Sequence, residues 1–224
     1  MKLSIIVPFL NEEQEIPGLC AHLQAFKDKG CEIILVDGGS KDLSSSLAQK
    51  QGFHVLHTQS GRAHQMNIGA KSATGDVFLF LHADTRPPSM ADTDICKKLI
   101  SDQYHWGRFD VSITGQSPLL KIIAWFINKR SELSSIATGD QGIFVKRTVF
   151  ERIGGFPSQC LMEDIELSIR LKKHSRPACL STKVVTSGRR WETRGIWHTI
   201  FLMWRLRFAY WLGISPQALA KHYV

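Results

Sequence analysis

Four short, largely apolar runs in the first half of the chain constrain its fold most strongly. They are residues 4–7, 33–36, 53–56 and 77–81, and Pro8 ends the first of them. The segments between them, at 13–27, 42–51 and 62–73, have the apolar spacing that is typical of helices. Strands without alternation are buried on both faces, and strands that alternate with helices form parallel sheets. The sequence therefore predicts an α/β fold with a mostly parallel sheet flanked by helices.

Polar and glycine residues follow three of these predicted strands. In sheets of this kind, ligands bind at the carboxyl ends of the strands. We therefore expect one binding edge that combines the residues after the first, second and fourth strands. These are Pro8, Asn11 and Glu12; Asp37 and Gly38; and His82, Ala83 and Asp84.

Two of the candidate ligand-binding positions have a simpler alternative interpretation. The carboxylate of Asp37 can accept hydrogen bonds from a base or a ribose, but Asp followed by Gly38 is also a common turn. Arg62 opens a predicted helix, whose N-terminus favours phosphate. The alternative there is a surface arginine with a buried Asn67 one turn later.

His82 and Asp84 are two residues apart on an extended segment, so their side chains project to the same side. Asp84 can bind Mg²⁺ or Mn²⁺, which would neutralise a pyrophosphate group and stabilise a departing nucleoside diphosphate. His82 is a softer ligand, so we expect it to hydrogen-bond a nucleotide. A histidine satisfied within the core is the alternative.

The pattern is less regular in the second half of the chain. We expect strands at 109–114 and 142–145 and helices at 119–128, 147–153 and 163–173. The last helix begins with Glu163 and Asp164, where the helix dipole favours an ionised carboxylate. Such a carboxylate beside an acceptor hydroxyl can act as general base, although acidic residues also simply cap helices.

The charge of the chain is concentrated in its second half. Residues 1–112 contain 11 Lys/Arg and 13 Asp/Glu, a net charge of −2, whereas residues 113–224 contain 17 and 7, a net charge of +10. This asymmetry indicates an anionic partner, namely nucleic acid, an anionic lipid surface or a phosphorylated substrate. Ordinary solvated lysines and arginines are the alternative.

Cysteine usage and hydropathy narrow the class of protein. The five cysteines include no C-x-x-C pair, which fits a reducing cytosol better than a zinc site or a disulfide framework. The apolar run near the N-terminus is too short for a signal peptide. No stretch of about 20 uncharged apolar residues occurs, so we expect no membrane-spanning helix.

As a set, the motifs resemble those of glycosyltransferase family 2. Two segments, Gln65-Met66-Asn67-Ile68-Gly69 and Phe80-Leu81-His82-Ala83-Asp84-Thr85, are further similar to a subgroup of short bacterial transferases associated with radical-SAM and selenium genes. The matches follow the family's order: Ile6-Val7-Pro8 with Asn11-Glu12, Val36-Asp37-Gly38-Gly39-Ser40, Asn67 with Gly69, Asp76, His82-Ala83-Asp84, Gly139-Asp140-Gln141-Gly142 and Glu163-Asp164.

The resemblance implies the GT-A fold with a Rossmann-like sheet, and inverting transfer of a sugar from a nucleotide-diphospho-sugar with Mn²⁺ or Mg²⁺. It implies Asp164 as the catalytic base and Asp84 as the metal ligand, although His82 stands where the family has a second aspartate. It assigns nucleotide-sugar binding to Pro8, Asn11, Glu12, Asp37, Gly38, Arg62, Asn67, His82, Ala83 and Asp84. It assigns acceptor or phosphate binding to Gly139, Asp140, Gln141, Glu163, Arg189, Arg190 and Trp191, the last three matching only part of an element of processive members.

Residues 196–214 form an aromatic segment that suits a helix lying in a membrane interface. We expect Arg205 and Arg207 within it to reach the lipid headgroups; packing on the domain or on a second subunit is the alternative. The aromatic residues are Trp197, Phe201, Trp204, Phe208, Tyr210 and Trp211.

These observations predict a domain at 1–194, with a donor half at 1–112 and an acceptor half at 113–194, followed by an amphipathic helix in 195–224. We expect a cytoplasmic protein, peripheral on the inner face of the cell membrane. Its partners would be a nucleotide-sugar, a lipid-like acceptor with a hydroxyl, carboxyl or phosphate group, and an anionic membrane, but no nucleic acid. A homodimer is the alternative use of the helix.

Two other functions fit parts of the pattern. A sugar-1-phosphate nucleotidylyltransferase shares the sheet, but it needs a glycine-rich, basic loop after the first strand, where this chain has Pro8-Phe9-Leu10-Asn11-Glu12. A non-enzymatic module that binds nucleic acid or membranes would use the basic second half, but no nucleic-acid recognition motif is present.

Overall fold

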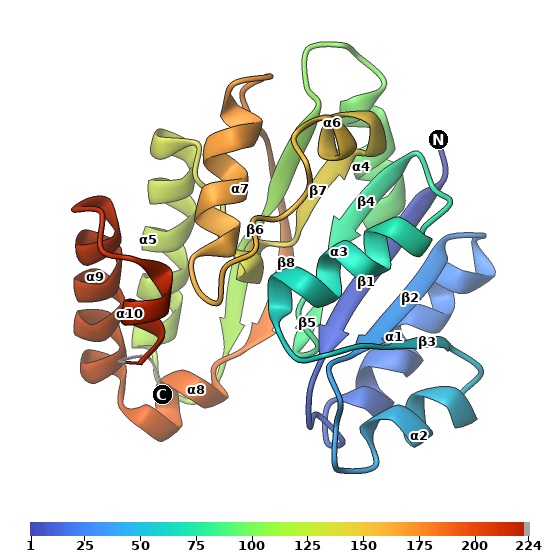
Figure 1. Ribbon diagram of the computed structural model, residues 1–224, viewed down its shortest axis with the longest axis horizontal. Coiled ribbons are helices and arrows are strands. Elements are labelled where there is room, and N and C mark those ends of the chain that lie inside the picture. Colours follow the sequence, from blue (N-terminus) through green and yellow to red (C-terminus); the bar gives the residue numbers. More distant parts are fainter. Residues whose placement is uncertain (222–224) are drawn as a thin grey trace.

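The structure is a computed structural model that describes residues 1–221. Within these residues, one eight-stranded sheet in the order β3-β2-β1-β4-β7-β6-β8-β5 runs through the molecule (Figure 1). The strands are β1 Leu3–Phe9, β2 Glu32–Asp37, β3 His54–His57, β4 Val77–Phe80, β5 Thr85–Arg86, β6 Trp106–Thr114, β7 Ile143–Lys146 and β8 Ala178–Ser187.

The first four strands pair in parallel, as the sequence predicts. The sheet becomes mixed beyond them, because β7 runs antiparallel to both β4 and β6. The long strand β8 pairs in parallel with β6, and the short β5 pairs antiparallel with β8. Strand β8 was not expected from the sequence.

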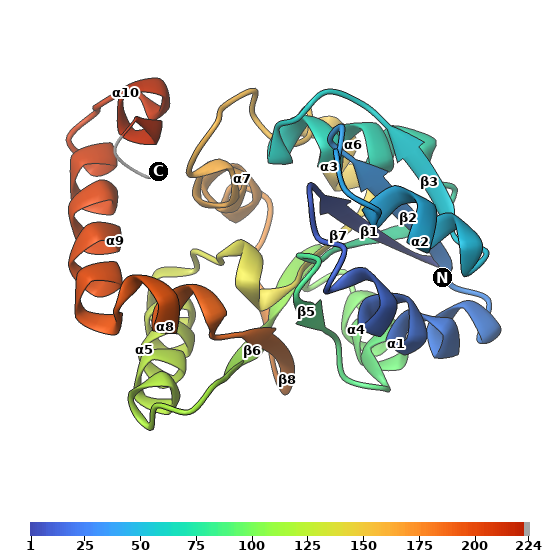
Figure 2. The same ribbon diagram turned by 90° about the horizontal axis from the view of Figure 1, so that it is seen from below.

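Helices cover both faces of the sheet. They are α1 Ile16–Asp28, α2 Ser44–Lys50, α3 Arg62–Ser72, α4 Ala91–Leu99, α5 Leu119–Ser134, α6 Arg147–Arg152, α7 Glu163–Lys172, α8 Arg189–Arg194, α9 Ile196–Trp211 and α10 Pro216–Ala220, with a 3₁₀ turn at Gly139–Gln141. Figure 2 shows α3, α6 and α7 on one side of the sheet and α1, α4 and α5 on the other. The expected helices are confirmed, and α4, α8 and α10 are additional.

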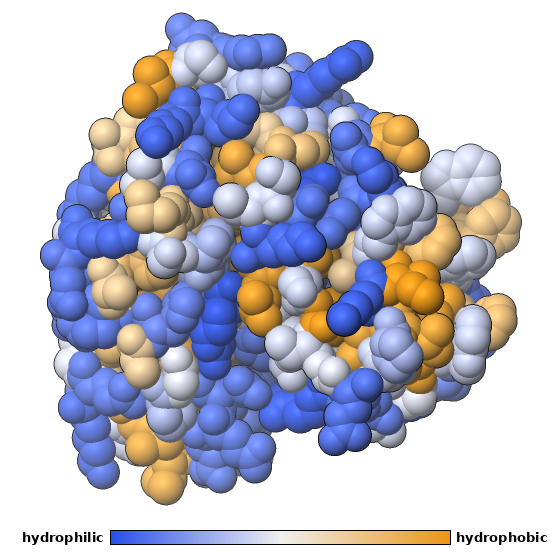
Figure 3. All heavy atoms as spheres, turned by 180° about the vertical axis from the view of Figure 1, so that it is seen from behind, coloured by the Kyte–Doolittle hydropathy of each residue, from blue (hydrophilic) through white to orange (hydrophobic). Residues whose placement is uncertain are grey.

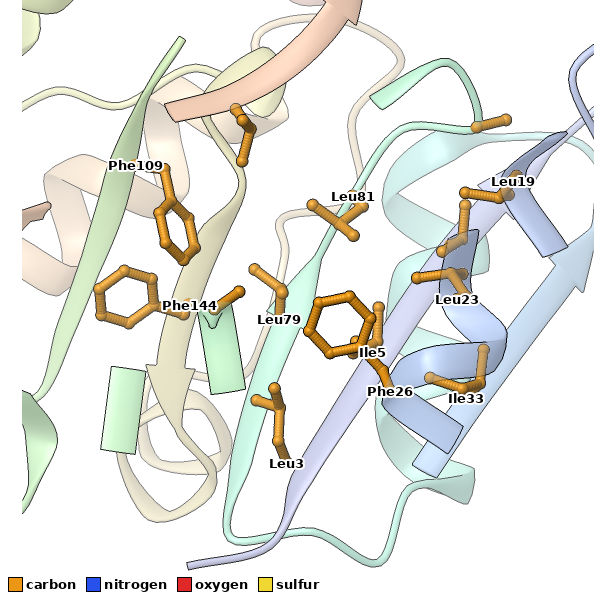
Figure 4. Close-up of a cluster of buried hydrophobic side chains, with 14 of the residues drawn as sticks. Leu3, Ile5, Leu19, Leu23, Phe26, Ile33, Leu79, Leu81, Phe109 and Phe144 are labelled. Carbon is orange, nitrogen blue, oxygen red and sulfur yellow. The ribbon is translucent and has the colours of Figure 1, made fainter. Parts of the chain in front are cut away.

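The central strands send side chains into two hydrophobic cores, one on each face of the sheet. In β1, Ile5 and Val7 point into the core beneath α1 and α4, shown in Figure 4, and Ile6 points into the opposite one. In β4, Leu79 points into the core beneath α1 and α4, and Phe78 points into the opposite one. Complete burial of such a side chain is worth roughly 1.5–3 kcal/mol. The demand for apolar residues on both faces explains why these runs do not alternate.

The expectation that Pro8 ends the first strand is wrong. Strand β1 continues to Phe9, and Pro8 lies opposite Val36 of β2. On the other side of β1, pairing with β4 ends at Ile6. Pro8 therefore sits where β1 has a neighbour on one side only, and the amide hydrogen that proline lacks is not needed there.

A third, small core holds the C-terminal helices against the domain. It consists of Leu161 and Met162 before α7, Leu206 of α9 and Leu219 of α10. The predicted division at residue 112 falls inside β6, and the division at residue 194 falls between α8 and α9. Both divisions remain predictions; the strands of the single sheet span residues 3–187 and lie on both sides of residue 112.

Candidate active site

A cleft of about 730 Å³ opens at the carboxyl ends of β1 and β4, between the two halves of the domain. Most of the residues singled out from the sequence line it, so the fold brings together positions more than 150 residues apart. Those that line the cleft are Pro8, Glu12, Arg62, His82, Ala83, Asp84, Gly139, Asp140, Glu163, Asp164, Arg189, Arg190 and Trp191.

Five predicted site residues lie outside this lining, and two of them fix the loops at its donor end. Asp37 is buried, and its Oδ1 accepts hydrogen bonds from the amide of Ser40 at 2.9 Å and from its hydroxyl at 2.6 Å. Its Oδ2 lies 3.3 Å from Nδ1 of His57. Asn11 accepts from the Lys41 amide at 2.8 Å, and its own amide donates to Ser40 Oγ at 2.9 Å. These contacts tie the loop after β1 to the loop after β2.

Asn67 and Gln141 make contacts that hold the chain together near the cleft. Asn67 donates to the carbonyl of Phe156 and accepts from the amide of the same residue, both at 2.9 Å. Gln141 is fully buried and accepts from the amide of Thr138 at 3.2 Å. Its amide nitrogen lies 3.4 Å from Oδ1 of Asn128.

Gln65 is a cleft residue to which the sequence analysis gave no role. Its buried side chain donates to the carbonyl of Phe9 at 2.9 Å and to that of Val36 at 2.8 Å, joining the ends of β1 and β2. A Cβ at Gly38 would lie 3.0 Å from this amide, which accounts for a glycine there. The sequence signal for this role is a polar residue on the buried face of a predicted helix, where an apolar residue would be expected.

Asp84 is the carboxylate at the end of the β4 segment. Its Oδ1 accepts from the hydroxyl of Thr85 at 3.3 Å and from that of Thr186 at 3.4 Å. Within residues 1–221 no group of three His, Cys, Asp or Glu side chains could hold a metal ion by itself. One carboxylate that shares a cation with phosphate oxygens is, however, a common arrangement for Mg²⁺. The residues present therefore fit a metal that binds together with a phosphorylated ligand.

His82 is paired with Asp140 across the cleft. Its Nδ1 lies 3.1 Å from Oδ1 of Asp140. Partial burial opposes ionisation of Asp140, but the hydrogen bond and charge of His82, with the charges of Arg62 and Arg190, lower its pKa to about 2. A Cβ at Gly139 would overlap the His82 ring, so this position requires glycine.

Asp164 stands at the start of α7 with both carboxylate oxygens positioned by backbone amides. Oδ2 accepts from the amide of Gly139 at 2.9 Å, and Oδ1 accepts from that of Ile165 at 2.8 Å. Met162 before the helix has a φ of 63°, a left-handed conformation that turns the chain into the cleft wall. The two amides therefore hold the Asp164 carboxylate in one orientation.

Among residues 1–221, five arginines line the cleft. Arg189 lies 3.2 Å from Glu12 and 3.7 Å from Glu15. Burial raises the pKa of Glu12, against the hydrogen bond and charge of Arg189, and the charge of Asp84 raises it further. The arginines that line the cleft are Arg62, Arg189, Arg190, Arg194 and Arg207.

Several cleft residues had no place in the sequence-based site. Thr186 and Ser187 come from the unexpected strand β8, and Thr199, Met203 and Arg207 come from α9. Arg205 is exposed, as an arginine at a membrane surface would be. The same expectation for Arg207 is wrong, because its helix face turns toward the cleft.

The sequence of the chain is similar to several proteins of one family. Residues 4–154 match the model described as Glycosyl transferase family 2. A Bacillus subtilis (strain 168) protein named Probable glycosyltransferase YdaM is 26% identical over 231 aligned positions, which cover 92% of this chain and 53% of that protein. An Enterobacter sp. (strain 638) protein named Undecaprenyl-phosphate 4-deoxy-4-formamido-L-arabinose transferase is 33% identical over 98 residues, 39% of this chain and 30% of that protein. The chain thus spans about half or less of these two relatives.

Solved structures confirm the expected GT-A fold. A mannosyltransferase from Pyrobaculum calidifontis, in complex with GDP-Man and Mn²⁺, superposes with a TM-score of 0.67 at 20% identity over 93% of this chain and 61% of that one. TarS from S. aureus, in complex with UDP-GlcNAc, gives a TM-score of 0.65 at 19% identity over 84% of this chain and 58% of that one.

Proposed function

Because this chain belongs to glycosyltransferase family 2, we propose that it transfers a sugar from a nucleotide-diphospho-sugar to an oxygen of an acceptor, with inversion at the anomeric carbon. One observation carries the proposal. Asp84 from the donor half and Asp164 from the acceptor half line the same arginine-rich cleft. A diphosphate needs the arginines and a cation, and an attacking hydroxyl needs a base.

The donor would lie at the carboxyl ends of β1 and β4. The loop contacts of Asp37 and Asn11 and the Gln65 bridge build this end of the cleft. Arg62 and Arg189 stand at its wall and can contact the diphosphate. The nucleotide-sugars bound by the mannosyltransferase and by TarS support a donor of this class.

A divalent cation would bind at Asp84 together with the donor. Bound there, Mn²⁺ or Mg²⁺ supplies positive charge against the diphosphate. The threonine hydroxyls hold the Asp84 carboxylate in one orientation. His82, already engaged with Asp140, is better placed to orient neighbouring groups than to ligate a hard cation.

Asp164 would act as general base. The acceptor oxygen forms a bond to the anomeric carbon as its proton passes to the Asp164 carboxylate. The bond from that carbon to the diphosphate oxygen breaks, and the nucleoside diphosphate leaves. The amides of Gly139 and Ile165 hold the carboxylate in place for this step.

We further propose that α9 binds an anionic membrane, with the cleft near the lipid surface. Among residues 1–221, no helix has the length and apolar character required to cross a bilayer. Five aromatic side chains of α9 are nevertheless 61–78% exposed: Trp197, Phe201, Trp204, Phe208 and Trp211. Figure 3 shows apolar side chains gathered at the right-hand end of the molecule, where α5 and α9 lie. Exposed tryptophan beside Arg205 and a basic second half is typical of interfacial helices, and the relative named for undecaprenyl phosphate supports a lipid-linked acceptor.

Thermal stabilisation by nucleotide-sugars tests the proposed donor. The full chain should melt at a higher temperature with one nucleotide-sugar and Mn²⁺ than with either alone. Release of nucleoside diphosphate from that donor, in the presence of bacterial lipid extract, should then report transfer. A chain that no nucleotide-sugar stabilises, with or without metal, would refute the assignment.

A further inference from the structure

Two arginines in the second half of the chain carry buried N–H groups that have no acceptor. Arg207 lines the cleft together with the proposed base, whereas Arg130 is not among the lining residues. Arg130 lies in the last turns of α5, and Arg207 lies in α9. In the described part of the chain, Nε and Nη2 of Arg130 and Nε of Arg207 are buried without a hydrogen-bond partner. An unsatisfied buried donor is costly, more so on a charged group. Folded proteins keep buried polar groups without partners mainly at functional sites, so these N–H groups indicate a binding site.

The positive charge of Arg207 also acts on the guanidinium group of Arg130. Burial, and then the positive charge of Arg207, lowers the pKa of Arg130 to about 10, against the attraction of Asp164 and Asp140. Burial likewise lowers the pKa of Arg207, and the same two carboxylates oppose the shift. The charges of Asp164 and Asp140 therefore do not offset the burial of either arginine. An added anion would stabilise both.

Helical geometry turns Arg207 toward the cleft. Thr199, Met203 and Arg207 all line it and are spaced four residues apart, so they share one face of α9. Four of the exposed aromatic residues, at positions 197, 201, 204 and 208, fall on a different face. Figure 2 shows α9 and α5 side by side at the end of the molecule remote from β3, with α7 facing them. An acceptor in the cleft along this face of α9 would meet Arg207.

We propose that Arg130 and Arg207 bind a phosphate group carried by the acceptor and so hold the acceptor beside Asp164. The inference rests on the proposed transfer function, and it names the acceptor class. A guanidinium donates two parallel hydrogen bonds to a phosphate, which suits the free N–H groups of both arginines. The phosphate can belong to a lipid phosphate or to a small soluble phosphate ester. An acceptor that also carries a hydroxyl would attack through that hydroxyl and give its proton to Asp164, whereas a monophosphate without one would attack through an ionised phosphate oxygen and need no base.

Calorimetry on the full chain, in the absence of membranes, tests the site with three probes. Farnesyl monophosphate represents the lipid phosphate, glycerol 3-phosphate the soluble one, and farnesol the same tail without the anion. Arg130→Gln and Arg207→Gln remove one charge each, and Lys121→Gln removes an exposed charge from α5 as the matched control. We expect each arginine variant to weaken farnesyl monophosphate binding roughly tenfold or more, as for a lost charge-assisted contact, with the control unchanged.

A purely structural role for the arginines predicts a different pattern. If they only brace Asp164, their replacement should lower the melting temperature and leave phosphate affinity unaltered. If they form a binding site, replacement should leave the melting temperature unchanged or raise it, because an unpartnered buried charge is removed. Tight binding of glycerol 3-phosphate to the parent would identify the soluble source, and a preference for farnesyl monophosphate the lipid source.

Three results would overturn the inference: phosphate affinity unchanged in both arginine variants, no binding of either phosphate to the parent, or farnesol binding as tightly as farnesyl monophosphate. Donor binding is measured separately, with nucleotide-sugars and Mn²⁺. A parent that binds donor while the arginine variants bind phosphate normally refutes this site alone. A parent that binds no donor refutes the proposed function, even if phosphate binding depends on both arginines.

Discussion

Nη1 of Arg62 lies 3.1 Å from Oε1 of Glu163, so an ion pair links α3 of the donor half to α7 of the acceptor half. The Glu163 side chain is 3% exposed, whereas that of Arg62 is 40% exposed. Arg62→Gln deprives a buried carboxylate of this cation and should lower the free energy of unfolding by about 1–3 kcal/mol. Glu163→Gln should cost less, because Arg62 can turn to water. Urea unfolding measures both, and Lys129→Gln in an exposed pair should have no measurable effect. Equal losses for Arg62→Gln and Glu163→Gln would contradict this asymmetry.

Replacement of Asp84 should remove the metal dependence of donor binding. Asp84→Asn keeps the shape of the side chain but lacks the charge that attracts a cation. Calorimetric donor affinity should then be the same with Mn²⁺ and with chelator, whereas His82→Asp should retain the metal effect. If Mn²⁺ still strengthens donor binding to Asp84→Asn, the cation binds elsewhere.

Asp164→Asn should slow transfer by roughly 10²–10⁴ if proton removal limits turnover. Donor affinity should change little, because the proposed base acts on the acceptor. One of its two backbone contacts must be lost, since an amide nitrogen cannot accept from an N–H, so the melting temperature is measured alongside. Transfer at close to the parental rate would move the role of base to Asp140 or Glu163.

The exposed aromatic stripe of α9 should determine binding to vesicles. Replacing Trp204 and Trp211 by Gln removes apolar area that a membrane would bury, so partitioning to anionic vesicles should fall at least roughly tenfold. Leu43→Gln, at a residue that is 62% exposed in the donor half, is the control. Binding of the parent should weaken with salt without vanishing. If the double variant floats like the parent, or instead separates a dimer into monomers, α9 is a packing element.

Asp140 should contribute stability that depends on pH. Its pKa is lowered to about 2, so its ionised form stabilises the fold above the unfolded value of about 3.9, and this contribution is lost as pH falls toward 2. The unfolding free energies of the parent and of Asp140→Asn should therefore differ at about pH 6 and approach each other near pH 3. Asp102→Asn, at a side chain that is 99% exposed, should show no such convergence. A constant difference across this range would mean that the ion pair with His82 does not hold Asp140 ionised.

The donor half could be predicted from the sequence because its strands are buried on both faces. Residues such as Ile5 and Ile6 are both fully buried, so consecutive apolar residues mark the strand without ambiguity. The ends of these strands then place Glu12 and Asp84 at one edge, and both line the cleft.

Strand β8 could not be predicted because its pattern is interrupted. Three consecutive exposed residues, Ser181, Thr182 and Lys183, break its alternation where the register with β6 shifts between Phe109 and Asp110. The cleft residues Thr186 and Ser187 were missed with it. The exposure of Arg207 was predicted wrongly for another reason. The composition of an aromatic helix does not show which of its faces packs against the protein, because that face is decided by the neighbouring helices, here α7 and α5.

The unequal size of the three cores has a kinetic consequence. The sheet and its covering helices share two large cores. Helices α9 and α10 contribute to a third core with four buried members among the described residues, and α9 meets the first core only through the partly buried Ile196 and Ile200. Cooperative units with few buried contacts open sub-globally, well below the free energy of complete unfolding. We expect amide hydrogens of α9 to exchange faster than those of β1 or β4. Helix α9, which carries Arg207, would then separate from the domain and return to it while the carboxyl ends of β1 and β4 stay folded. The rate at which the acceptor exchanges would therefore not depend on the stability of the sheet.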